Sequence, residues 1–524
     1  MSQLLLNIQN LIKSENLIEA EELAWTLYGQ NKKEVIALKT LGLTLLMQRK
    51  YKGALDIYNQ ANSIKKNDFD IVNNIGHLSL QLEEFKQAEE FSIIANQLNP
   101  DAYQPYITLA DINLRKRNFD KAYEYIIEMQ KRVTFEVLIT NHQTLYLMLD
   151  IFVACNKEEE ALNFINHCYT KKFIPEIFYY HSGLKASSIS NNLIKVANDV
   201  IKNAKFQNHI TKAKTLGPIY FGLGKYYLGK DQALSDINYI QGNSEIGEIQ
   251  RFRPLETQKF LKNIKKTFEQ NQFVPKNMDN DGSNLIFICG MPRSGTTLLE
   301  SIVCSSGEVC SCGELISLSD LFGKYTDPDV NGEIDNKIFE NADEGDNYLR
   351  RINFLNTYEK KKYVLDKLPG NFYLIGFIKK RFPKSKILYV KRDPWDNAIS
   401  LYQQFYVVNI PYAASFFNTA VYYANHEEIM RYWEEDLKID FMTINYEKLV
   451  SDTETEANKV YEYCGFSSSY NSDSRKGFFS RTASKSQVRG EIHKKSIKKQ
   501  AFEQQKKEFL ENLLIQRDYW KQNQ

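Results

Sequence analysis

The segment NLIFICGMPRSGTTLLESIVCSS, residues 284–306, decides the fold of the C-terminal half of this chain. Residues 284–290 form an apolar run that ends in Gly, the pattern of a buried parallel strand. A short loop follows, and the sequence after it reads as a helix. Further on, YVLDK, KILYVKR and FMTINY are short, apolar and followed by polar or helical sequence. Strands that alternate with helices in this way predict an α/β domain with a parallel sheet.

The loop GMPRSGTT, residues 290–297, lies between this strand and this helix, where backbone N–H groups and the positive helix end can bind a phosphate. Its spacing is that of a Walker A loop, but Thr296 and Thr297 stand where the usual Lys-Ser/Thr pair would be. Without that lysine the loop lacks the cation that reaches the β and γ phosphates, which argues against ATP or GTP hydrolysis. Arg293 offers a replacement cation with forked donors for an oxyanion.

A period of 34 residues runs through the first third of the chain. The recurring columns are Gly42, Gly76 and Ala110, then Ala54, Ala88 and Ala122, with Tyr51, Phe85 and Phe119 three places before the second column. This pattern is typical of tetratricopeptide repeats, in which small residues let two helices approach closely. We predict stacked helical hairpins over residues 1–270, a linker over 271–283 and the α/β domain over 284–524. A non-repetitive helical bundle with coincidental alanines is the alternative.

Composition excludes several classes of protein. Lys plus Arg (67) nearly cancel Asp plus Glu (65), so no global positive field favours nucleic acid or anionic lipid. Seven cysteines at irregular positions make no disulfide framework and fit a reducing compartment. No uncharged run approaches the length of a membrane helix. We therefore expect a cytoplasmic protein without a membrane span and without a nucleic-acid partner.

The GMPRSGTT loop after a strand resembles the 5′-phosphosulfate loop of sulfotransferases that use 3′-phosphoadenosine 5′-phosphosulfate (PAPS), in particular the bacterial tetratricopeptide-repeat sulfotransferases and the related tyrosylprotein sulfotransferases. Three further segments are similar to that family: ILYVKRDPWDNAISLYQQFY, FMTINYEKLVSD and RTASKSQVRGEI. The resemblance covers about residues 284–495 and implies a tetratricopeptide-type α-solenoid followed by a P-loop-like α/β sulfotransferase domain.

The resemblance also implies which residues bind the nucleotide. One set would hold the 5′-phosphosulfate: Arg293, Ser294, Gly295, Thr296 and Thr297. Arg392, at a strand end, and Ser400, about two turns along the next helix, would close on the 3′-phosphate. Ser484 matches a residue near the leaving group in relatives, and Arg489 is a candidate phosphate contact. For Tyr446, packing against the adenine and support of the sheet remain open alternatives.

Two residues are the catalytic candidates beside Arg293. Glu314, in CSCGELISL, matches the Glu that is thought to take the acceptor proton in tyrosylprotein and bacterial relatives, although a helix-starting carboxylate is the plain alternative. Lys367, in YVLDKLPGN, matches a Lys proposed to stabilise the bridging oxygen of the departing bisphosphate; a solvated strand-end lysine is its alternative. His426 and His493 do not follow the loop at a comparable distance. We treat the Arg-Lys-Gly triplet at residues 475–477 as coincidence.

The resulting hypothesis is a sulfotransferase that moves a sulfuryl group from PAPS to a hydroxyl or amine acceptor. The sulfuryl group carries less charge than a γ-phosphoryl, and no carboxylate or His cluster is evident, so we predict no metal. The acceptor class stays open among protein tyrosine, carbohydrate and small molecule. The array would bind the acceptor or a protein partner, or would self-associate. The alternatives are a P-loop nucleotide kinase or triphosphatase, and a non-catalytic repeat scaffold with a degenerate nucleotide-binding domain.

Overall fold

The computed structural model describes residues 2–270, 281–318, 342–406, 410–475, 478–479 and 502–523. The chain forms two compact units. The first is Met1–Lys157 with Asn347–Lys360, and the second is Glu158–Asp346 with Lys361–Gln524. The chain therefore passes between the units three times. The boundaries proposed from the sequence at residues 270 and 283 follow a change of sequence pattern, and they stay a prediction.

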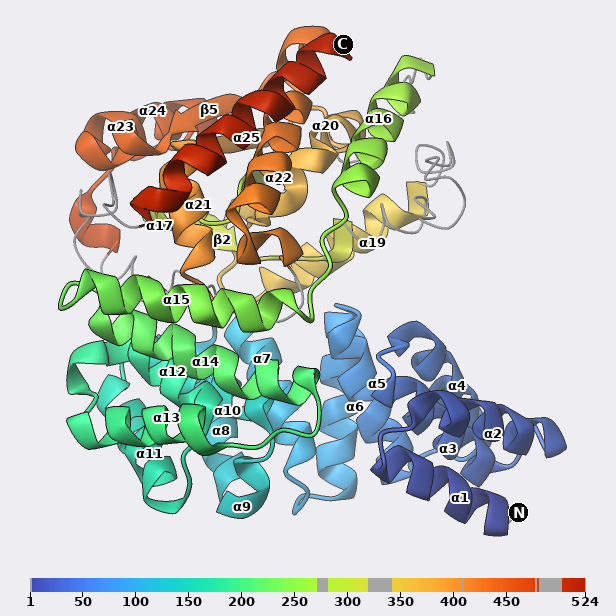
Figure 1. Cartoon of the computed structure of the whole chain (residues 1–524). Helices are drawn as coiled ribbons and strands as arrows, with labels where there is room; N and C mark the ends of the chain where they lie inside the picture. The colour runs from blue at the N-terminus through green and yellow to red at the C-terminus, as the bar shows by residue number, and fades with distance from the viewer. Residues whose placement is uncertain are drawn as a thin grey trace. The chain divides into compact units, whose positions relative to one another are not determined.

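The first unit is an array of antiparallel helix pairs (Figure 1). Its helices are α1 (Ser2–Lys13), α2 (Leu17–Gln30), α3 (Val35–Met47), α4 (Tyr51–Ile64), α5 (Phe69–Gln81), α6 (Phe85–Leu98), α7 (Gln104–Arg115), α8 (Phe119–Gln130), α9 (Phe135–Leu138), α10 (His142–Ala154) and most of α19 (Ala342–Leu355). The predicted helical repeats are thus confirmed, and the two small-residue columns and the aromatic column fall in α3 to α8.

Close helix packing explains those small residues. A Cβ at Gly42 would lie 2.7 Å from the Tyr58 ring of the partner helix, and a Cβ at Gly76 would lie 2.6 Å from Ser92 Oγ. Ala54, Ala88 and Ala122 are fully buried. Larger residues at these places would force the two helices of each hairpin apart.

The backbone shows the same period at the turns between paired helices. Glu15, Arg49, Glu83 and Arg117 follow one another at intervals of 34 residues, and each has a positive φ between 57° and 61°. None of them is glycine, although the left-handed region favours glycine. The next turn residue with a positive φ, Asn156, comes 39 residues after Arg117, so the register slips there. The 34-residue register therefore includes the hairpin of α1 and α2.

The second unit holds the later helical hairpins and the sheet. The helices are α11 (Glu158–Lys171), α12 (Pro175–Lys185), α13 (Asn191–Asn203), α14 (His209–Tyr227), α15 (Gln232–Gly247), α16 (Pro254–Gln270), α17 (Thr296–Cys304), α20 (Ile375–Arg381), α21 (Pro394–Tyr402), α22 (Phe416–Arg431), α23 (Tyr446–Ser451), α24 (Thr453–Cys464) and α25 (Glu503–Gln522). Short 3-10 or π turns are η1 (Ala186–Ser188), η3 (Pro369–Leu374), η4 (Pro411–Ala414), η5 (Tyr432–Asp436) and η6 (Ser472–Arg475).

The five-stranded sheet is parallel throughout, with the order β2-β3-β1-β4-β5. The strands are β1 (Leu285–Gly290), β2 (Val309–Ser311), β3 (Tyr363–Asp366), β4 (Lys386–Lys391) and β5 (Met442–Asn445). The predicted α/β class is confirmed, and four of these strands were expected from the sequence. Since β1 pairs with both β3 and β4, the segments that leave these three strands meet at one edge of the sheet.

The core of the sheet is apolar, as the sequence of β1 requires. All six residues of β1 are buried, and α17 and α24 pack against the strands through one cluster of buried side chains. In the same unit, α22 contacts both α16 and α25 (Figure 1). No helix among the described residues has both the length and the apolar character needed to cross a bilayer.

We expect Gly76→Val to destabilise the array, because the new side chain overlaps Ser92 and its backbone N–H. Overpacking of this kind lowers the free energy of unfolding by about 2 kcal/mol. Gly53→Ala is the matched control, since its Cβ would meet only Leu45 Cδ1 at 3.7 Å. That change should be neutral or stabilising by up to about 1 kcal/mol. Urea unfolding followed by circular dichroism measures both, and equal effects of the two variants would contradict close packing at Gly76.

Candidate active site

The loop between β1 and α17 has a backbone that only certain residues can adopt. Gly290 has φ +146°, Arg293 has φ +68°, and Gly295, the residue before α17, has φ +111°. A Cβ at Gly290 would lie 2.5 Å from the carbonyl oxygen of Val390, and a Cβ at Gly295 would lie 2.3 Å from the Tyr446 ring. The two glycines therefore let the loop pass directly beside β4 and α23. The loop ends at the N-terminus of α17, where the first backbone N–H groups are not used within the helix.

Hydrogen bonds join this loop to the segment that follows β4. Arg392 Nη1 donates to the backbone carbonyl of Arg293 at 2.8 Å, and Arg293 Nε donates to Ser400 Oγ at 3.2 Å. From the same helix as Ser400, Asn397 Nδ2 donates to the Pro292 carbonyl at 3.0 Å. The structure thus brings together Arg293, Arg392 and Ser400, which the sequence analysis assigned to the two ends of one nucleotide.

Arg392 is almost wholly buried, with 5% of its surface exposed. Its guanidinium carbon lies 4.5 Å from the centre of the Tyr446 ring, and its carbonyl accepts a hydrogen bond of 2.5 Å from the Tyr423 hydroxyl. Burial lowers the pKa of Arg392, and the nearby positive charge of Arg293 acts in the same direction. Two cations held this close in a dry site favour the binding of an anion between them.

The hydroxyl-bearing residues of the loop are also buried. Ser294, Thr296 and Thr297 are each less than 5% exposed. Ser294 Oγ has no hydrogen-bond partner among the described residues. A buried hydroxyl without a partner is costly, and an oxyanion in the loop would provide one. The donor set of this loop therefore fits a phosphate or sulfate group.

A second cluster lies where β2 and β3 end. Lys367 Nζ donates to Glu314 Oε1 at 2.5 Å and lies 3.6 Å from Glu300 Oε2. The Lys367 side chain has no exposed surface and Glu300 is 2% exposed, whereas 41% of the Glu314 side chain remains exposed. Burial alone would lower the pKa of Lys367, but the carboxylates of Glu314 and Glu300 outweigh it and hold that pKa above its ordinary value. Lys367 is therefore a buried, charged ammonium between two acids.

The later helical hairpins reach the same region of the second unit. The Tyr179 hydroxyl, from α12, donates to Gln404 Oε1 at 3.2 Å and accepts from the Phe405 N–H at 3.3 Å. Lys225 Nζ, from α14, lies 3.8 Å from the centre of the Tyr179 ring. Burial would raise the pKa of Tyr179, but Lys225 and other neighbours, Arg293 among them, bring it below its ordinary value. Gln404 lies four residues after Ser400, just beyond the end of α21, so α12 approaches the Arg293 site.

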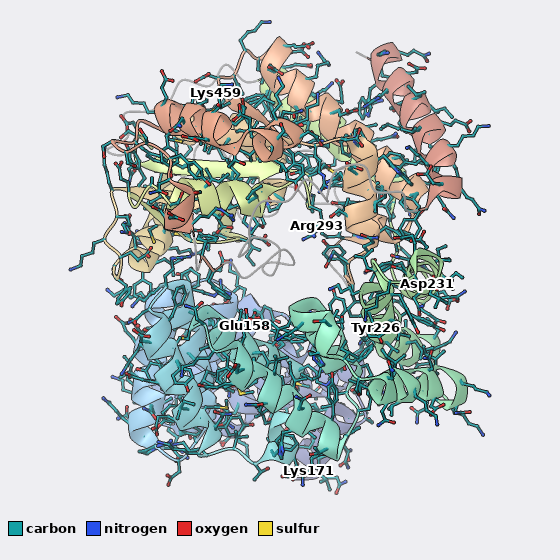
Figure 2. All side chains as sticks on the ribbon, turned by 90° about the vertical axis from the view of Figure 1, so that its left-hand side faces the viewer. Glu158, Lys171, Tyr226, Asp231, Arg293 and Lys459 are labelled. Carbon is teal, nitrogen blue, oxygen red and sulfur yellow. The ribbon has the colours of Figure 1, made fainter. Side chains whose placement is uncertain are left out.

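In Figure 2, Arg293 lies on the side of the α/β layers that faces the green helices where Tyr226 and Asp231 are labelled. Two more hydrogen bonds hold this arrangement. Asn243 Nδ2 donates to the Tyr402 carbonyl at 2.8 Å, and Gln250 Nε2 donates to the Tyr406 carbonyl. Helices that the sequence assigns to the array therefore support the end of α21.

Some of the expected site residues lie outside the described residues. They are Ser484 and Arg489; Lys476, Gly477 and His493, which the sequence analysis did not assign to the site, lie outside the described residues as well. Tyr446 lies in the site, and its ring covers Gly295 and Arg392. His426 is fully buried between aromatic rings, and burial lowers its pKa to about 3. Such a neutral, enclosed imidazole is not exposed to any acceptor. Among the described residues no group of three His, Cys, Asp or Glu side chains is arranged to hold a metal ion.

The sequence analysis missed several residues that build the site. Glu300 gave one usable signal, because it is the single charged residue in the otherwise apolar stretch TTLLESIVC. Asn397 could have been suspected from its place between Arg392 and Ser400. Tyr179 and Lys225 gave no signal in the sequence, since more than sixty residues separate them from the loop. Only the tertiary fold brings them near it.

Comparisons with known proteins give matches over parts of the chain. Residues 285–470 match the model of the family described as "Sulfotransferase family". An uncharacterized protein of Aquifex aeolicus is 29% identical over 194 residues, which are 34% of this chain and 25% of that protein. BBSome complex member BBS4 of Bos taurus is 25% identical over 215 residues, 39% of this chain and 37% of its own. The chain spans less than half the length of either relative.

Solved structures are similar in parts of the chain. A tetratricopeptide repeat protein from Parabacteroides merdae is 15% identical and covers 47% of this chain and 92% of its own, with a TM-score of 0.33. Sulfotransferase STF9 from Mycobacterium avium is 13% identical and covers 55% of this chain and 86% of its own, with a TM-score of 0.25. The family match confirms the resemblance inferred from the C-terminal motifs.

We expect Gly295→Ala to destabilise the second unit and to disturb the loop, because it combines a positive φ with a clash against the Tyr446 ring. The combined strain and overlap should lower the free energy of unfolding by at least about 2 kcal/mol. Gly307→Ala serves as the control, since Gly307 has φ +77° but no atom within 4 Å of its Cβ. That variant carries only the backbone strain, about 1 kcal/mol. The stability of the two variants is compared by thermal melting. An equal loss of stability in both would mean that Tyr446 does not restrict residue 295.

Proposed function

We propose that this chain, whose residues 285–470 form a sulfotransferase-family domain, transfers a sulfuryl group from PAPS to a hydroxyl or amine acceptor. The observation that carries the proposal is the connection between Arg293, Arg392 and Ser400. It unites the anion loop after β1 with the segment after β4, so two anionic groups of one nucleotide can be bound at adjacent strand ends. A nucleotide with phosphates at both its 3′ and 5′ positions fits this pair of sites.

The donor would be held at both ends. The loop from Arg293 to Thr297, with its buried hydroxyls and the N-terminus of α17, would bind the 5′-phosphosulfate. Arg392 and Ser400 would bind the 3′-phosphate, with Arg293 shared between the two groups. Ser484 and Arg489 are proposed further contacts on the strength of the motif alone. Tyr446 would support the loop and Arg392 from behind, and a contact with the adenine remains a prediction.

The chemistry would take place beside Glu314 and Lys367. The donor supplies an activated sulfuryl group: a new S–O or S–N bond forms to the acceptor while the bond to the 5′-phosphate oxygen breaks. Glu314, the more exposed member of the acidic pair, would accept the proton that the acceptor loses. Lys367 would donate a hydrogen bond to the departing phosphate oxygen, where negative charge grows. Arg293 would stabilise the charge that spreads over the transferring group.

The array is proposed to bind the acceptor or a protein partner, or to associate with a second copy. Such arrays normally use their faces for binding. In the first unit, a hollow of 620 Å³ has both charged and apolar walls, among them Lys39, Asp68, Asp70, Val35 and Leu43. The acceptor class stays open among protein tyrosine, carbohydrate and small molecule. A hollow with charges of both signs next to apolar side chains suits a peptide better than a uniformly anionic polymer.

Adenosine 3′,5′-bisphosphate should raise the melting temperature without any metal. At one hundred times its Kd it should stabilise the protein by about 2.7 kcal/mol. Arg392→Met should weaken binding by between about tenfold and a hundredfold, because a charge-assisted bond in a buried site is lost. Arg253→Met is the control, since Arg253 is exposed and pairs only locally with Glu256. Stabilisation by ATP with magnesium, and none by the bisphosphate, would instead support a nucleotide kinase or triphosphatase.

Glu314→Gln should leave bisphosphate binding within about threefold of the wild type and lower turnover by about a hundredfold or more, because a general base contributes that much. Turnover is measured as transfer of radiolabelled sulfate from the donor to components of a cell extract. Glu308→Gln, the same substitution on the segment before β2, keeps its turnover because Glu308 bonds to Ser467 away from Lys367. Unchanged turnover in Glu314→Gln would remove Glu314 from the role of base.

A further inference from the structure

Glu300 is a buried acid that the proposed chemistry does not use. It lies in the second turn of α17, the helix that begins at the anion loop, among buried apolar residues such as Leu299 and Ile302. A carboxylate in such a place is unfavourable unless it is paired and hydrogen-bonded. Its two oxygens are used differently: Oε1 accepts a hydrogen bond of 2.7 Å from Ser311 Oγ, and Oε2 lies 3.6 Å from Lys367 Nζ.

The Ser311 hydroxyl connects Glu300 to the backbone next to Glu314. Ser311 Oγ accepts a hydrogen bond of 3.1 Å from the Gly313 N–H while it donates to Glu300. The Lys367 N–H in turn donates to the Gly313 carbonyl at 2.9 Å. The carboxylate of α17, the end of β2 and the end of β3 are thereby held in one network. Glu300 is consequently fixed in position, whereas Glu314 is partly exposed and held mainly through Lys367.

Lys367 therefore has two acidic neighbours, of which Glu300 is fixed in position and Glu314 is partly exposed. Its closer partner at 2.5 Å is Glu314, which the proposed mechanism requires as a proton acceptor. The Lys367 ammonium occupies the Glu314 oxygen Oε1, which would otherwise be available to take the acceptor proton. During transfer, Lys367 must turn its N–H groups toward the departing oxygen and release Glu314. If Glu314 were the single carboxylate beside it, a lysine with no exposed surface would lose its proton when Glu314 moved away.

We infer that Glu300 is a positioning residue that keeps Lys367 charged and in place while Glu314 is free to act as the base. This inference rests on the proposed function. Glu300 takes no proton and touches no reacting atom in this scheme. The acceptor proton goes to Glu314, the sulfuryl group goes to the acceptor, and the leaving oxygen receives a hydrogen bond from Lys367. The negative charge of Glu300 remains constant throughout.

Other ionisable groups near this network must be considered for any pH dependence. They are Asp366 at the end of β3, Cys310 and Cys312 around the end of β2, and Tyr406, which is close enough to Glu314 for the two charges to interact. The neighbouring Cys310 and burial raise the pKa of the Cys312 thiol well above its ordinary value, and burial raises that of Tyr406. Neither group therefore changes its charge in the range where enzymes are assayed.

The experiment is the titration of Lys367 in Glu300→Gln, a variant that keeps the size of the side chain and its ability to accept from Ser311. Lysine labelled with ¹³C at Cε is followed by NMR, and Lys367→Met assigns the signal. We expect the pKa of Lys367 to fall by at least about one unit in Glu300→Gln, since one of two stabilising charges is lost. Glu308→Gln should leave the pKa of Lys367 unchanged. Glu300→Asp, which keeps the negative charge, should give a Lys367 pKa close to that of the wild type.

Turnover provides the second readout. In Glu300→Gln, kcat should fall about tenfold and the alkaline limb of its pH profile should move to lower pH, while bisphosphate Kd changes less than about threefold. A Lys367 titration and a pH profile equal to those of the wild type would overturn the inference. If Glu300→Gln does not fold, Ser311→Ala is measured instead, because it removes the hydrogen bond that holds Glu300. A Lys367 pKa and a pH profile equal to those of the wild type in that variant would overturn the inference. Failure to bind the bisphosphate would refute the proposed function, and the Lys367 titration would still decide whether Glu300 controls this lysine.

Discussion

The hydrogen bond from Arg392 to the carbonyl of Arg293 joins the segments that leave two neighbouring strands, β1 and β4. A buried guanidinium needs partners for its donors, and a backbone carbonyl in a loop with positive φ values needs a fixed neighbour. This hydrogen bond satisfies the Arg293 carbonyl and one donor of the Arg392 guanidinium. Because Gly290 passes against the Val390 carbonyl, the loop cannot move away from β4 without breaking this contact. The remaining site residues are arranged around the resulting pair of cations.

The strand order also places the cluster of Lys367, Glu314 and Glu300 next to the loop. β1 lies between β3 and β4, so the residues after β4 place Arg392 and Ser400 on one side of the loop and the residues after β3 place Lys367 on the other. β2 lies beyond β3 and brings Glu314 to the same edge. Glu300 reaches this group from α17, the helix that the loop itself begins. One strand–loop–helix unit thus contributes both the anion loop and a charge that stabilises the lysine.

Much of this arrangement could be predicted from the sequence, because local patterns determine it. The 34-residue period reflects close contacts such as that of Gly42 with Tyr58, and the apolar run before Gly290 reflects a strand buried on both faces. The resemblance to the sulfotransferase family, which rests on sequence motifs, assigned Arg293, Arg392 and Ser400 to the binding of one nucleotide. The β2 strand has only three residues and leaves too weak a pattern to be recognised. The partnership of Glu300 with Lys367 depends on strand order, and the contact of Tyr179 with Gln404 depends on how the later hairpins pack. The local sequence therefore does not show which residue Glu300 or Tyr179 contacts.

The central claim is that one nucleotide spans the two arginines. A crystal structure with adenosine 3′,5′-bisphosphate tests it most directly. We expect the 5′-phosphate in the loop at the start of α17, in contact with Arg293 and the loop hydroxyls, and the 3′-phosphate between Arg392 and Ser400. A bisphosphate bound elsewhere, or bound with either phosphate away from these two arginines, would contradict the account.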